Sequence, residues 1–370
     1  MADITCGFIG LGLIGGSIAR ALKKASDTSD TNITIYAYDI NEASLTQAKK
    51  DGVIDASFTT IDASFSVCDY IFLCAPVSFN DDNLLTLKPF LSPECILTDV
   101  GSVKTDIHKH ITALGLDAQF IGGHPMAGSE RIGYINSKAQ LLENAYYILT
   151  PTSLVSEEKI SQFTSLVTMM GAIPLRLSFT EHDYVTAAIS HLPHIIASSL
   201  VNLVHDSDSK DGVMKMVAAG GFKDITRIAS SSPQMWQQIC LTNTENISSL
   251  LDNYIIALQT IKQKLDAKNE DALYTFFDDA RVYRDSFIEA SSGPIKKSYA
   301  LNLDIPDEAG ALAAISTILA LNAINIKNIG IVHNREFEEG VLRIEFYDES
   351  SVKSALKLLS DKGYSPHERK

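Results

Sequence analysis

The sequence predicts an α/β dinucleotide-binding domain, followed by an all-α domain and then by a small α+β domain. Three observations indicate this order. Short apolar runs alternate with helical patterns up to about Leu177, long helical patterns begin at Thr180, and a second alternating stretch follows the linker Ser291–Pro294. A chain of 370 residues is also long enough for two or three ordinary cores. We therefore expect domains at residues 1–177, 178–292 and 293–370.

The composition excludes several classes of partner. Lys and Arg number 31 against 45 Asp and Glu, a formal net charge of −14, so we expect neither nucleic acid nor an anionic membrane as partner. The five cysteines show no CxxC spacing, which indicates reduced thiols and neither disulfides nor a metal site. Glycines and an arginine interrupt GLGLIGGSIARAL, and no uninterrupted apolar run approaches the roughly 18 residues of a membrane span. We expect a soluble, cytoplasmic protein.

The first part of the chain alternates strand-like and helical patterns. The expected strands are ITCGFIGLG, ITIYAYD, YIFLCAP, CILTDVGS, FIGGHP and YYILTP, each closing on a turn residue. Helices are expected from about Gly15 to Lys24 and over EASLTQAKKDG, which Gly52 ends, and SEEKISQFTSLVTMMGAIPLRLS adds a last unit. This alternation indicates βαβ units and a mostly parallel sheet.

Long helices are expected from Thr180 onwards. Thr180 and Asp183 have the spacing of a capping box, and Pro193 should kink the helix that they begin. Another helix begins at SSSPQMW, with a serine at its N-cap and Pro233 at its first position. It carries a long apolar stripe that packs either against another subunit or within the chain. The stripe consists of Trp236, Ile239, Ile247, Leu250, Tyr254, Leu258, Ile261 and Leu265.

The tail after the linker has its own alternating pattern. SYALNLDIP, a helix from about Ala309, NIGIVHN, VLRIEFYD and the helix SVKSALKLLSDKG follow one another in a βαββα order. This order predicts a small α+β module.

Gly10, Gly12 and Gly15 form a GxGxxG signature between the first strand and the first helix. In this signature the first glycine permits a tight turn, the second lets the backbone approach a pyrophosphate, and the third lets the helix pack on the strand. Asp39 follows at the end of the second strand, where an acid accepts hydrogen bonds from the adenosine ribose and repels a 2′-phosphate. The pair predicts a site for NAD in preference to NADP, although Asp39 could instead begin a turn before Asn41.

Two stretches that follow expected strands carry candidate residues for an anionic substrate. In DVGSVK, Ser102 and Lys104 could line the crevice at the carboxyl end of the sheet, or Ser102 could only cap a helix. GGHPMAGSE holds His124 between glycines, which free the backbone to approach a ligand, and Pro125, which fixes the chain direction. The imidazole is therefore aimed and cannot swing freely.

Two helical stretches carry further candidates. EHDYVTAAISHLPH puts Asp183, His191 and His194 on or near one helix face, although a single helical histidine is more often a satisfied core or surface group. HLPH has no acidic partner at ligand spacing, which argues against a metal site. In GGFKDITRIASSSPQMW, Lys223 and Arg227 are four residues apart, either in a substrate site or as a solvated charge pair.

Taken together, these stretches resemble the prephenate dehydrogenase family, the enzymes that commit chorismate-derived prephenate to tyrosine. GLGLIGGS, GSVK, GHPMAGSE, HDYVTAAISHLPH and GGFKDITRIASSSPQMW occur in this order across roughly the first 290 residues. The resemblance implies a Rossmann-type domain that binds NAD, a helical dimerisation domain, an active site between them and a homodimer. It also implies oxidation of the ring carbon that bears the hydroxyl, with loss of the ring carboxylate, to give 4-hydroxyphenylpyruvate.

The resemblance also assigns roles to single residues. It implies His124 as the base that takes the hydroxyl proton and Ser102 as the hydrogen-bonding partner that orients the reacting groups. Arg227 matches the family's substrate-binding arginine, whose fork suits a carboxylate. The other implied substrate-side residues are His194, Lys223, Trp236, Asp183 and Glu130, of which the last two order or gate the site. The implied cofactor contacts are Gly10, Gly12, Leu13, Ile14, Gly15, Asp39, Ala75 and Pro76.

The tail PDEAGALAAISTILALNAINIKNIGI resembles an ACT domain, a ferredoxin-like module that binds amino-acid effectors. It is shorter than the full pattern, because only Ser365–Lys370 remain for a closing strand. The helix N-terminus after PDEAG could receive an effector carboxylate, with Gly310 allowing close approach, and end-product control suggests tyrosine as the effector. The tail could instead be an assembly module without an effector.

Three other functions fit parts of the sequence. An arogenate dehydrogenase runs the same chemistry on a substrate with an amine in place of the side-chain keto group. A β-hydroxyacid dehydrogenase has a similar layout with a lysine base in the helical domain, which the HPMAGSE loop and the paired helical histidines disfavour. A catalytically inactive sensor of NAD and an amino acid is disfavoured by the intact set Ser102, His124 and Arg227.

Overall fold

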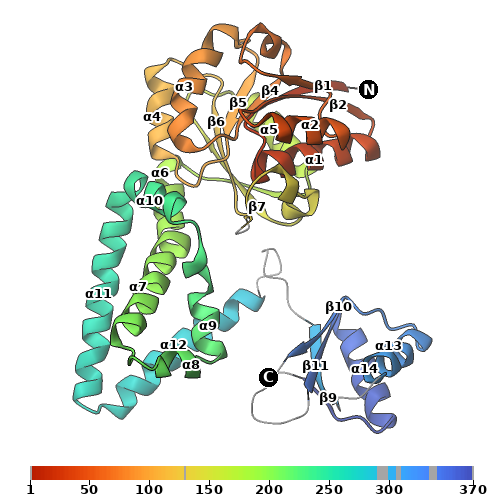
Figure 1. Cartoon of the computed structure of the whole chain (residues 1–370), viewed down its shortest axis with the longest axis vertical. Coiled ribbons are helices and arrows are strands. Elements are labelled where there is room, and N and C mark those ends of the chain that lie inside the picture. Colours follow the sequence, from red (N-terminus) through yellow and green to blue (C-terminus); the bar gives the residue numbers. More distant parts are fainter. Residues whose placement is uncertain (1, 129–130, 290–298, 306–309, 333–339, 369–370) are drawn as a thin grey trace. The chain divides into compact units, whose positions relative to one another are not determined.

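The computed structural model describes residues 2–128, 131–289, 299–305, 310–332 and 340–368. The chain divides into two units, Met1–Leu273 and Tyr274–Lys370. The first unit combines a sheet covered by helices with a set of long helices, and the second contains a small sheet with its own helices (Figure 1).

Five parallel strands form the central sheet of the first unit, in the order β3-β2-β1-β4-β5. The strands are β1 Ala2–Ile9, β2 Thr31–Tyr38, β3 Ala56–Phe58, β4 Tyr70–Leu73 and β5 Ile96–Asp99. The helices among them are α1 Leu13–Thr28, α2 Glu42–Lys50, α3 Val77–Leu87 and α4 Thr105–Ala113. Strand order reverses between β1 and β4, which confirms the predicted Rossmann-type α/β domain and sets its ligand crevice at that point.

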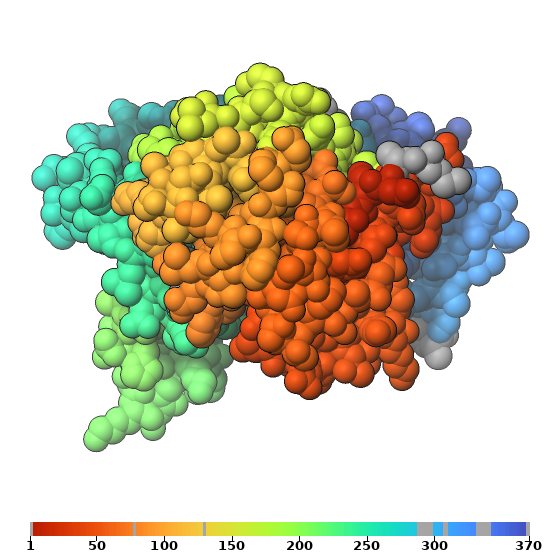
Figure 2. All heavy atoms as spheres, turned by 90° about the horizontal axis from the view of Figure 1, so that it is seen from above, coloured from red at the N-terminus to blue at the C-terminus, as the bar shows by residue number. Residues whose placement is uncertain are grey.

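Helices bury both faces of this sheet. Phe8 on β1 points into one core, together with Leu22 of α1 and Phe163 of α5, which spans Glu157–Met169. Its neighbour Ile9 points into the other core with Leu84 of α3. Successive residues of a strand alternate between faces, so both β1 faces are apolar. Figure 1 shows the helices on the two sides of the sheet, and Figure 2 shows the closely packed outer surface of this part in red and orange.

The sheet pattern changes beyond β5. A single parallel bridge, Leu97 to Phe120, precedes a second sheet of β6 Ile121–Pro125, β7 Tyr146–Pro151 and β8 Ile173–Arg176. The described part of the segment between β6 and β7 holds only short 3₁₀ turns, so β7 returns antiparallel to β6. The predicted mostly parallel arrangement is confirmed by β1 to β5 and by β7 with β8, and the pairing of β6 with β7 is an antiparallel exception to it.

Long helices follow β8, as the sequence predicts. They are α6 Phe179–Thr186, a π-helical turn Ala187–His191, α7 Leu192–Ser207, α8 Val213–Val217, α9 Gly220–Thr226, α10 Pro233–Thr242, α11 Thr244–Asp266 and α12 Glu270–Glu289. The π-helical turn ends two residues before Pro193, whose backbone nitrogen has no hydrogen to donate within the helix.

The two predicted helix starts have different outcomes. Ser232 is the N-cap of α10 as predicted, and its hydroxyl accepts a hydrogen bond from the Met235 N–H. The predicted capping box at Thr180 and Asp183 is wrong, because the helix begins earlier. Ser178 is the N-cap of α6. Asp183 is thereby free to form tertiary contacts.

The long apolar stripe predicted from Trp236 to Leu265 is interrupted and only partly buried. Asn243 separates α10 from α11, so the stripe lies on two helices. Ile239 and Ile247 are buried, whereas Leu258 and Leu265 are exposed within the chain. Apolar surface of this kind is typical of a helix that packs against another subunit.

One helical run among the described residues, Phe179–Ser207, is long and apolar enough to cross a membrane by length and composition. This is weak evidence for a membrane span, because helices of soluble proteins pass the same test. The run also holds His182 and Asp183, which are fully buried and hydrogen-bonded.

The second unit contains a four-stranded antiparallel sheet in the order β10-β11-β9-β12. Its elements are β9 Tyr299–Ile305, α13 Ala311–Leu321, β10 Asn328–Val332, β11 Gly340–Phe346, α14 Glu349–Asp361 and β12 Pro366–Glu368. This βαββαβ order is ferredoxin-like and confirms the predicted α+β class. The expectation that the chain ends too early for a closing strand is wrong, because three residues suffice for β12 to pair with β9.

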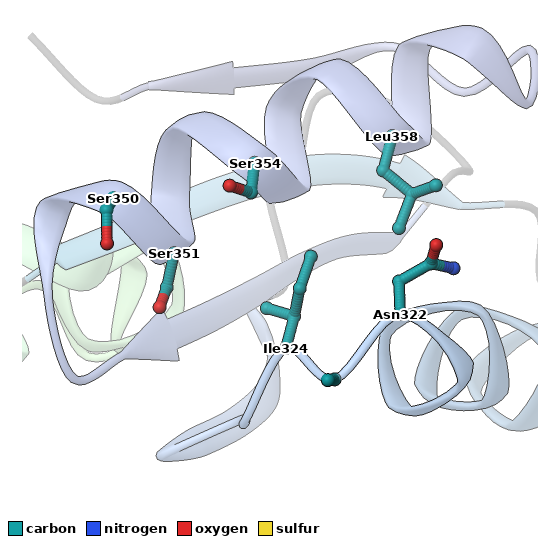
Figure 3. Close-up of a pocket in the computed structure, with 7 residues that line it drawn as sticks. Asn322, Ile324, Ser350, Ser351, Ser354 and Leu358 are labelled. Carbon is teal, nitrogen blue, oxygen red and sulfur yellow. The ribbon is translucent and has the colours of Figure 1, made fainter.

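A hollow lies on the second unit between α14 and the segment that follows α13 (Figure 3). It is lined by Asn322, Ala323, Ile324, Ser350, Ser351, Ser354 and Leu358. Asp348, the N-cap of α14, accepts hydrogen bonds from the hydroxyls of Ser350 and Ser351, so these polar groups are already engaged.

Candidate active site

The GxGxxG turn joins β1 to α1. Gly10 has a φ of 100°, and a Cβ there would lie 2.6 Å from the backbone nitrogen of Ala75. A Cβ at Gly15 would lie 2.6 Å from the carbonyl oxygen of Gly10, so only glycine lets α1 pack this closely. A Cβ at Gly12 would meet nothing within 4 Å. The turn is therefore tight where it meets β4 and open at Gly12.

Asp39 at the end of β2 braces this turn. One carboxylate oxygen accepts a hydrogen bond from the Leu11 N–H at 2.5 Å, and the other accepts one from the Asn41 N–H at 2.7 Å. The bond from Asn41 forms the turn that the sequence analysis gave as the alternative role of Asp39. The bond from Leu11 links Asp39 to the glycine turn as well. Each oxygen keeps a further lone pair, and the side chain is partly exposed, so ribose hydroxyls could still donate to it.

The start of α1 fits the phosphates of a dinucleotide. No side chain caps this helix, so the N–H groups of its first residues, Leu13 and Ile14, are left for an anion. Ala75 and Pro76 follow β4 directly beside Gly10, at the point where the strand order reverses. Gly12, with open space where a Cβ would stand, lets the backbone and the ligand approach each other.

Asp99 at the end of β5 ties together the two loops that carry the predicted catalytic residues. Its Oδ2 accepts hydrogen bonds from the Gly101 N–H at 2.9 Å and from the ammonium group of Lys104, and its Oδ1 accepts one from the Gly123 N–H at 3.2 Å. Each predicted catalytic residue directly follows one of these glycines. The prediction that Lys104 lines the crevice is wrong, because its side chain is fully buried in the ion pair with Asp99.

Gly122 and Gly123 precede His124 for a packing reason. A Cβ at Gly122 would lie 2.3 Å from the hydroxyl oxygen of Thr150 on β7, and one at Gly123 would lie 2.6 Å from the carbonyl oxygen of Asp99. The prediction that these two glycines free the backbone for a ligand is therefore wrong. They let β6 fit between β5 and β7, and this packing fixes the position of His124.

His124 is the first of three side chains in a hydrogen-bonded chain. Its Nδ1 lies 2.7 Å from Nε2 of His182, and Nδ1 of His182 lies 2.7 Å from Oδ1 of Asp183. The two imidazole rings meet edge to face, with centroids 5.0 Å apart. His182 and Asp183 are fully buried, whereas His124 is partly exposed. The hydrogen bond to His182 uses Nδ1 of His124 and leaves Nε2 outside this row of hydrogen bonds.

The carboxylate of Asp183 joins α4 to α6. Its Oδ1 also accepts a hydrogen bond from the Lys104 N–H at 2.8 Å, and its Oδ2 accepts from the N–H and the hydroxyl of Thr105 at 2.8 and 2.6 Å. Burial raises the pKa of Asp183, but hydrogen bonds from His182, Thr105 and Lys104 outweigh burial and hold the pKa below its usual value. This geometry fits the predicted ordering role of Asp183 and not a contact with substrate.

The imidazoles of His124 and His182 are both neutral near pH 7. Burial lowers the pKa of His124 well below its usual value, and the positive charge of Lys104 lowers it further. Burial also lowers the pKa of His182, against the opposing effect of the hydrogen bond that its Nδ1–H donates to Asp183. A neutral imidazole is the form that can accept a proton.

A second group of candidate residues lies around α7 and α10. The imidazole of His194 stacks on the ring of Trp236, with centroids 3.6 Å apart, and its Nδ1 lies 2.8 Å from the carbonyl oxygen of Ser190. Because a carbonyl only accepts, Nδ1 carries the hydrogen and Nε2 of a neutral His194 is unprotonated. Burial lowers the pKa of His194, and the positive charge of Arg227 lowers it further.

His191 lies between the two groups. Its ring meets that of Trp236 edge to face at 5.9 Å, and burial lowers the pKa of His191 to about 4. Asn243 donates to Nδ1 of His191 at 3.2 Å and to the carbonyl oxygen of Asp183 at 2.8 Å. The first unit thus brings together, from four separate stretches, the predicted residues Lys104, His124, Asp183, His191, His194, Arg227 and Trp236.

The remaining predicted residues are placed less closely. Ser102 is half-buried in the turn between β5 and α4, next to the glycine that Asp99 holds. Lys223 is exposed on α9, one helical turn before Arg227. Glu130 lies outside the described residues. Within the described residues, no three His, Cys, Asp or Glu side chains are grouped so that they could hold a metal ion.

Sequence reasoning missed His182, Asp99 and Asn243. The adjacent pair His182–Asp183 is the one local signal that could have pointed to an oriented imidazole. Asp99 reaches the Gly123 N–H and Asn243 reaches the Asp183 carbonyl across 24 and 60 residues of chain, and such contacts leave no periodic pattern.

Two family models match this chain. Residues 18–174 match the nucleotide-binding domain of prephenate dehydrogenase, and residues 178–279 match the dimerization domain of prephenate dehydrogenase. The prephenate dehydrogenase of Bacillus subtilis (strain 168) is 38% identical over 351 residues, which cover 94% of this chain and 93% of that protein. This match therefore extends into the second unit.

Solved structures give the same picture for the first part of the chain. Prephenate dehydrogenase from A. aeolicus, in complex with hydroxyphenyl propionate and NAD+, is 31% identical with a TM-score of 0.72, and the match covers 78% of this chain and 99% of that chain. Synechocystis arogenate dehydrogenase is 26% identical with a TM-score of 0.70, and the match covers 77% and 100% of the two chains.

Proposed function

The chain belongs to the prephenate dehydrogenase family and is an NAD-dependent oxidoreductase of prephenate, and we propose that His124 is the base in this reaction. The observation that carries the proposal is the hydrogen bond between Nδ1 of His124 and His182, which leaves Nε2 of a neutral imidazole for the substrate. The product is 4-hydroxyphenylpyruvate.

The proposed reaction breaks two bonds to the ring. Hydride leaves the carbon that bears the hydroxyl, and Nε2 of His124 takes the hydroxyl proton as it leaves. The bond to the ring carboxylate then breaks as carbon dioxide departs, and its electron pair makes the ring aromatic and ends on the oxygen. His124 returns its proton to that oxygen, so the imidazole is neutral again after each turnover. Bound NAD supplies the hydride acceptor.

Arg227 and His194 are proposed to hold the substrate. Prephenate carries two carboxylates and the whole chain has a formal net charge of −14, so local cations must provide the attraction. The planar guanidinium of Arg227 suits a carboxylate in two parallel hydrogen bonds. The Trp236 Nε1–H is buried without a hydrogen-bond partner among the described residues, so a substrate oxygen could accept from it.

Ser102, Lys223 and Glu130 complete the proposed site. Ser102 follows a glycine that Asp99 holds, which supports a fixed hydroxyl beside the crevice. Lys223 precedes Arg227 by one helical turn and adds positive charge on the substrate side. Asp183 is proposed to order the site through His182 and α4.

NAD is proposed to bind at the GxGxxG turn. The contacts proposed are Gly10, Gly12, Leu13, Ile14, Gly15, Asp39, Ala75 and Pro76. The uncapped start of α1 supports a pyrophosphate there, and the carboxylate of Asp39 favours NAD over NADP because it repels a 2′-phosphate.

The test is the variant His124→Asn. We expect kcat with prephenate and NAD to fall by roughly 10²–10⁴-fold while prephenate still binds, because the loss is that of a general base. His205→Asn is the matched control, since His205 is exposed at the far end of α7 and should leave kcat unchanged. Unchanged turnover of His124→Asn across the pH profile would exclude His124 as the base.

Arogenate is the alternative substrate, favoured by the similarity to Synechocystis arogenate dehydrogenase. The two substrates differ only in the side-chain amine or keto group. Parallel kcat/KM values for both substrates, each with NAD and NADP, decide between them. We expect the higher value with prephenate and NAD.

We propose that the second unit is an ACT regulatory module that binds tyrosine. Its ferredoxin-like sheet supports this, and Gly310, the N-cap of α13, has a φ of 97° and provides no side-chain cap. Residues 306–309 of the predicted effector loop lie outside the described residues. Removing the residues after Gly293 should leave activity and abolish any inhibition by tyrosine, since the A. aeolicus chain is matched almost whole by 78% of this chain.

We also propose a soluble, cytoplasmic homodimer with domain boundaries near residues 177 and 292. The match of residues 178–279 to a dimerization domain and the exposed apolar side chains of α11 support the dimer. The two family matches, which meet between residues 174 and 178, support the first boundary.

A further inference from the structure

We propose that His182 is a positioning residue that holds His124 in the one tautomer able to accept the substrate proton and then shares the positive charge of that proton. The inference rests on the proposed role of His124 as the base. It assigns a role to a side chain that is fully buried and that the roles proposed above leave without one.

The tautomer follows from the hydrogen-bonded chain, beginning at Asp183. An ionised carboxylate only accepts hydrogen bonds, so Nδ1 of His182 must carry the hydrogen that points to Asp183. Nε2 of a neutral His182 is then unprotonated and can only accept. The hydrogen between the two rings therefore belongs to Nδ1 of His124, and Nε2 of His124 keeps its lone pair.

The same chain accommodates the proton that catalysis brings. When Nε2 of His124 takes the hydroxyl proton, the Nδ1–H of His124 can move to Nε2 of His182 along the 2.7 Å contact. His182 then carries the positive charge while its own Nδ1–H still points to the Asp183 carboxylate. The reverse shift returns the proton to His124 and then to the product oxygen. A carboxylate supports the histidine base of serine proteases in the same sense, by fixing its tautomer and stabilising its charged form.

The surroundings make His182 a rigid support. Asp183 cannot turn away, because the Lys104 and Thr105 N–H groups at the start of α4 hold both of its oxygens. The carbonyl oxygen of His182 accepts a hydrogen bond from the Thr186 hydroxyl at 2.9 Å within α6.

The charges that face the two rings are few and mostly paired. The charges of Asp183, Asp99 and Lys104 shift the pKa of His182, and the charge of Lys104 shifts the pKa of His124. Asp99 neutralises the Lys104 ammonium directly. The carboxylate of Asp183 is therefore the anion that stabilises a positive charge on His182 or His124.

Two substitutions of His182 separate positioning from packing. In His182→Gln the amide lies near the place of Nε2, so its oxygen can accept from Nδ1 of His124 but cannot take up a proton. In His182→Asn the amide lies near the place of Nδ1, so it can donate to Asp183 but does not reach His124. We expect kcat to fall ~10-fold in the first and ~10²–10³-fold in the second, with KM for prephenate changed less than about threefold in both.

His108 provides the matched control. It is also buried, and its contacts are elsewhere: Nε2 lies 3.0 Å from the Thr150 hydroxyl, and the ring stacks on Phe179. His108→Gln and His108→Asn should lower stability, but kcat should not fall further for Asn than for Gln, as it does at His182. A purely structural His182 would favour Asn over Gln, since Asn preserves the bond to Asp183. A kcat of His182→Asn equal to or above that of His182→Gln, or both within threefold of the unsubstituted enzyme, overturns the proposal.

Nuclear magnetic resonance of ¹⁵N-histidine-labelled enzyme tests the tautomer even if the variants fold poorly. We expect Nδ1 of His124 to be protonated and Nε2 to be unprotonated, and a protonated Nε2 in the neutral ring overturns the inference. His124→Asn, measured in parallel, separates the two proposals. If His124→Asn retains kcat, His124 is not the base and the proposed function fails. If His124→Asn loses kcat while the His182 variants remain active, His124 stays the base and only the proposed role of His182 is overturned.

Discussion

Replacing Lys104 by Met tests whether the buried ion pair with Asp99 maintains the catalytic end of the sheet. The side chains of Lys104 and Asp99 are 0% and 3% exposed, so the substitution leaves a carboxylate buried without its counter-charge. Breaking a buried pair from one side typically costs about 3–5 kcal/mol. In a domain of this size each kcal/mol lowers Tm by about 2–4 °C, so we expect a fall of about 6–20 °C.

Differential scanning calorimetry measures this loss, and a neighbouring lysine provides the control. Lys109 also lies on α4, in an exposed pair with Asp106 at 3.4 Å, and Lys109→Met should change stability by less than about 1 kcal/mol. The double variant Lys104→Met with Asp99→Asn removes the unpaired charge. It should recover at least about 1 kcal/mol of the loss.

The same substitution should lower turnover. Asp99 accepts hydrogen bonds from the N–H groups of Gly101 and Gly123, each directly before a proposed catalytic residue. Without the Lys104 charge the carboxylate should shift toward water, which would displace both glycines. We expect kcat to fall at least ~10-fold at a temperature where the variant is fully folded. A Lys104→Met enzyme within 1 kcal/mol of the unsubstituted stability and with the same kcat would refute this reasoning.

Three further predictions concern the substrate, the cofactor and pH. Arg227→Ala should raise KM for prephenate about 10–150-fold, since a charged hydrogen bond contributes about 1.5–3 kcal/mol, and an unchanged KM would place the carboxylate elsewhere. Asp39→Ala should raise KM for NAD and narrow the preference over NADP, whereas an unaltered cofactor ratio would contradict the role of Asp39. Burial lowers the pKa of both His108 and His191 to about 4. The unfolded chain binds these protons at higher pH than the folded one, so the free energy of unfolding should fall as the pH is lowered from 6.5 to 4, by about 3 kcal/mol for each histidine. A Tm that stays constant across this pH range would contradict the prediction.

The sequence predicted the elements of the fold where the signal is local. Alternating apolar runs and turn residues located β1, β2, β4 and β5 and the helices α1 and α2, because strand and helix periodicity depend only on neighbouring residues. The short strand β3 and the helix α3 were not predicted, and α4 was considered only as a helix that Ser102 could cap. The antiparallel pairing of β6 with β7 was not predictable in this way, because it depends on how the long segment between them returns. The closing strand β12 was also missed, since three residues carry too little pattern to distinguish a strand from a loose end.

The helical part shows how tertiary contacts override local rules. The spacing of Thr180 and Asp183 satisfied a capping box, but Asp183 forms hydrogen bonds with the start of α4 and Ser178 caps the helix instead. The long stripe after Trp236 suggested one helix, yet Asn243 separates α10 from α11 with its amide bonded to His191 and to the Asp183 carbonyl. In both places a polar side chain forms contacts within the site that no local pattern encodes.

The two ends of the site differ in what a sequence can reveal, and the difference has a physical cause. The GxGxxG turn is a backbone device, so its glycines stand next to one another and are visible in the sequence. The base is a side-chain device that needs a fixed tautomer, and the groups that fix it come from α6 and from the start of α4. His124 could be found because it stands in a distinctive loop, whereas the contact of His182 with His124 is apparent only in the fold, where nitrogens of the two rings lie 2.7 Å apart. The part of an active site that is hardest to predict is therefore the support of its reacting group, and in this chain the support joins the nucleotide-binding domain to the helical domain.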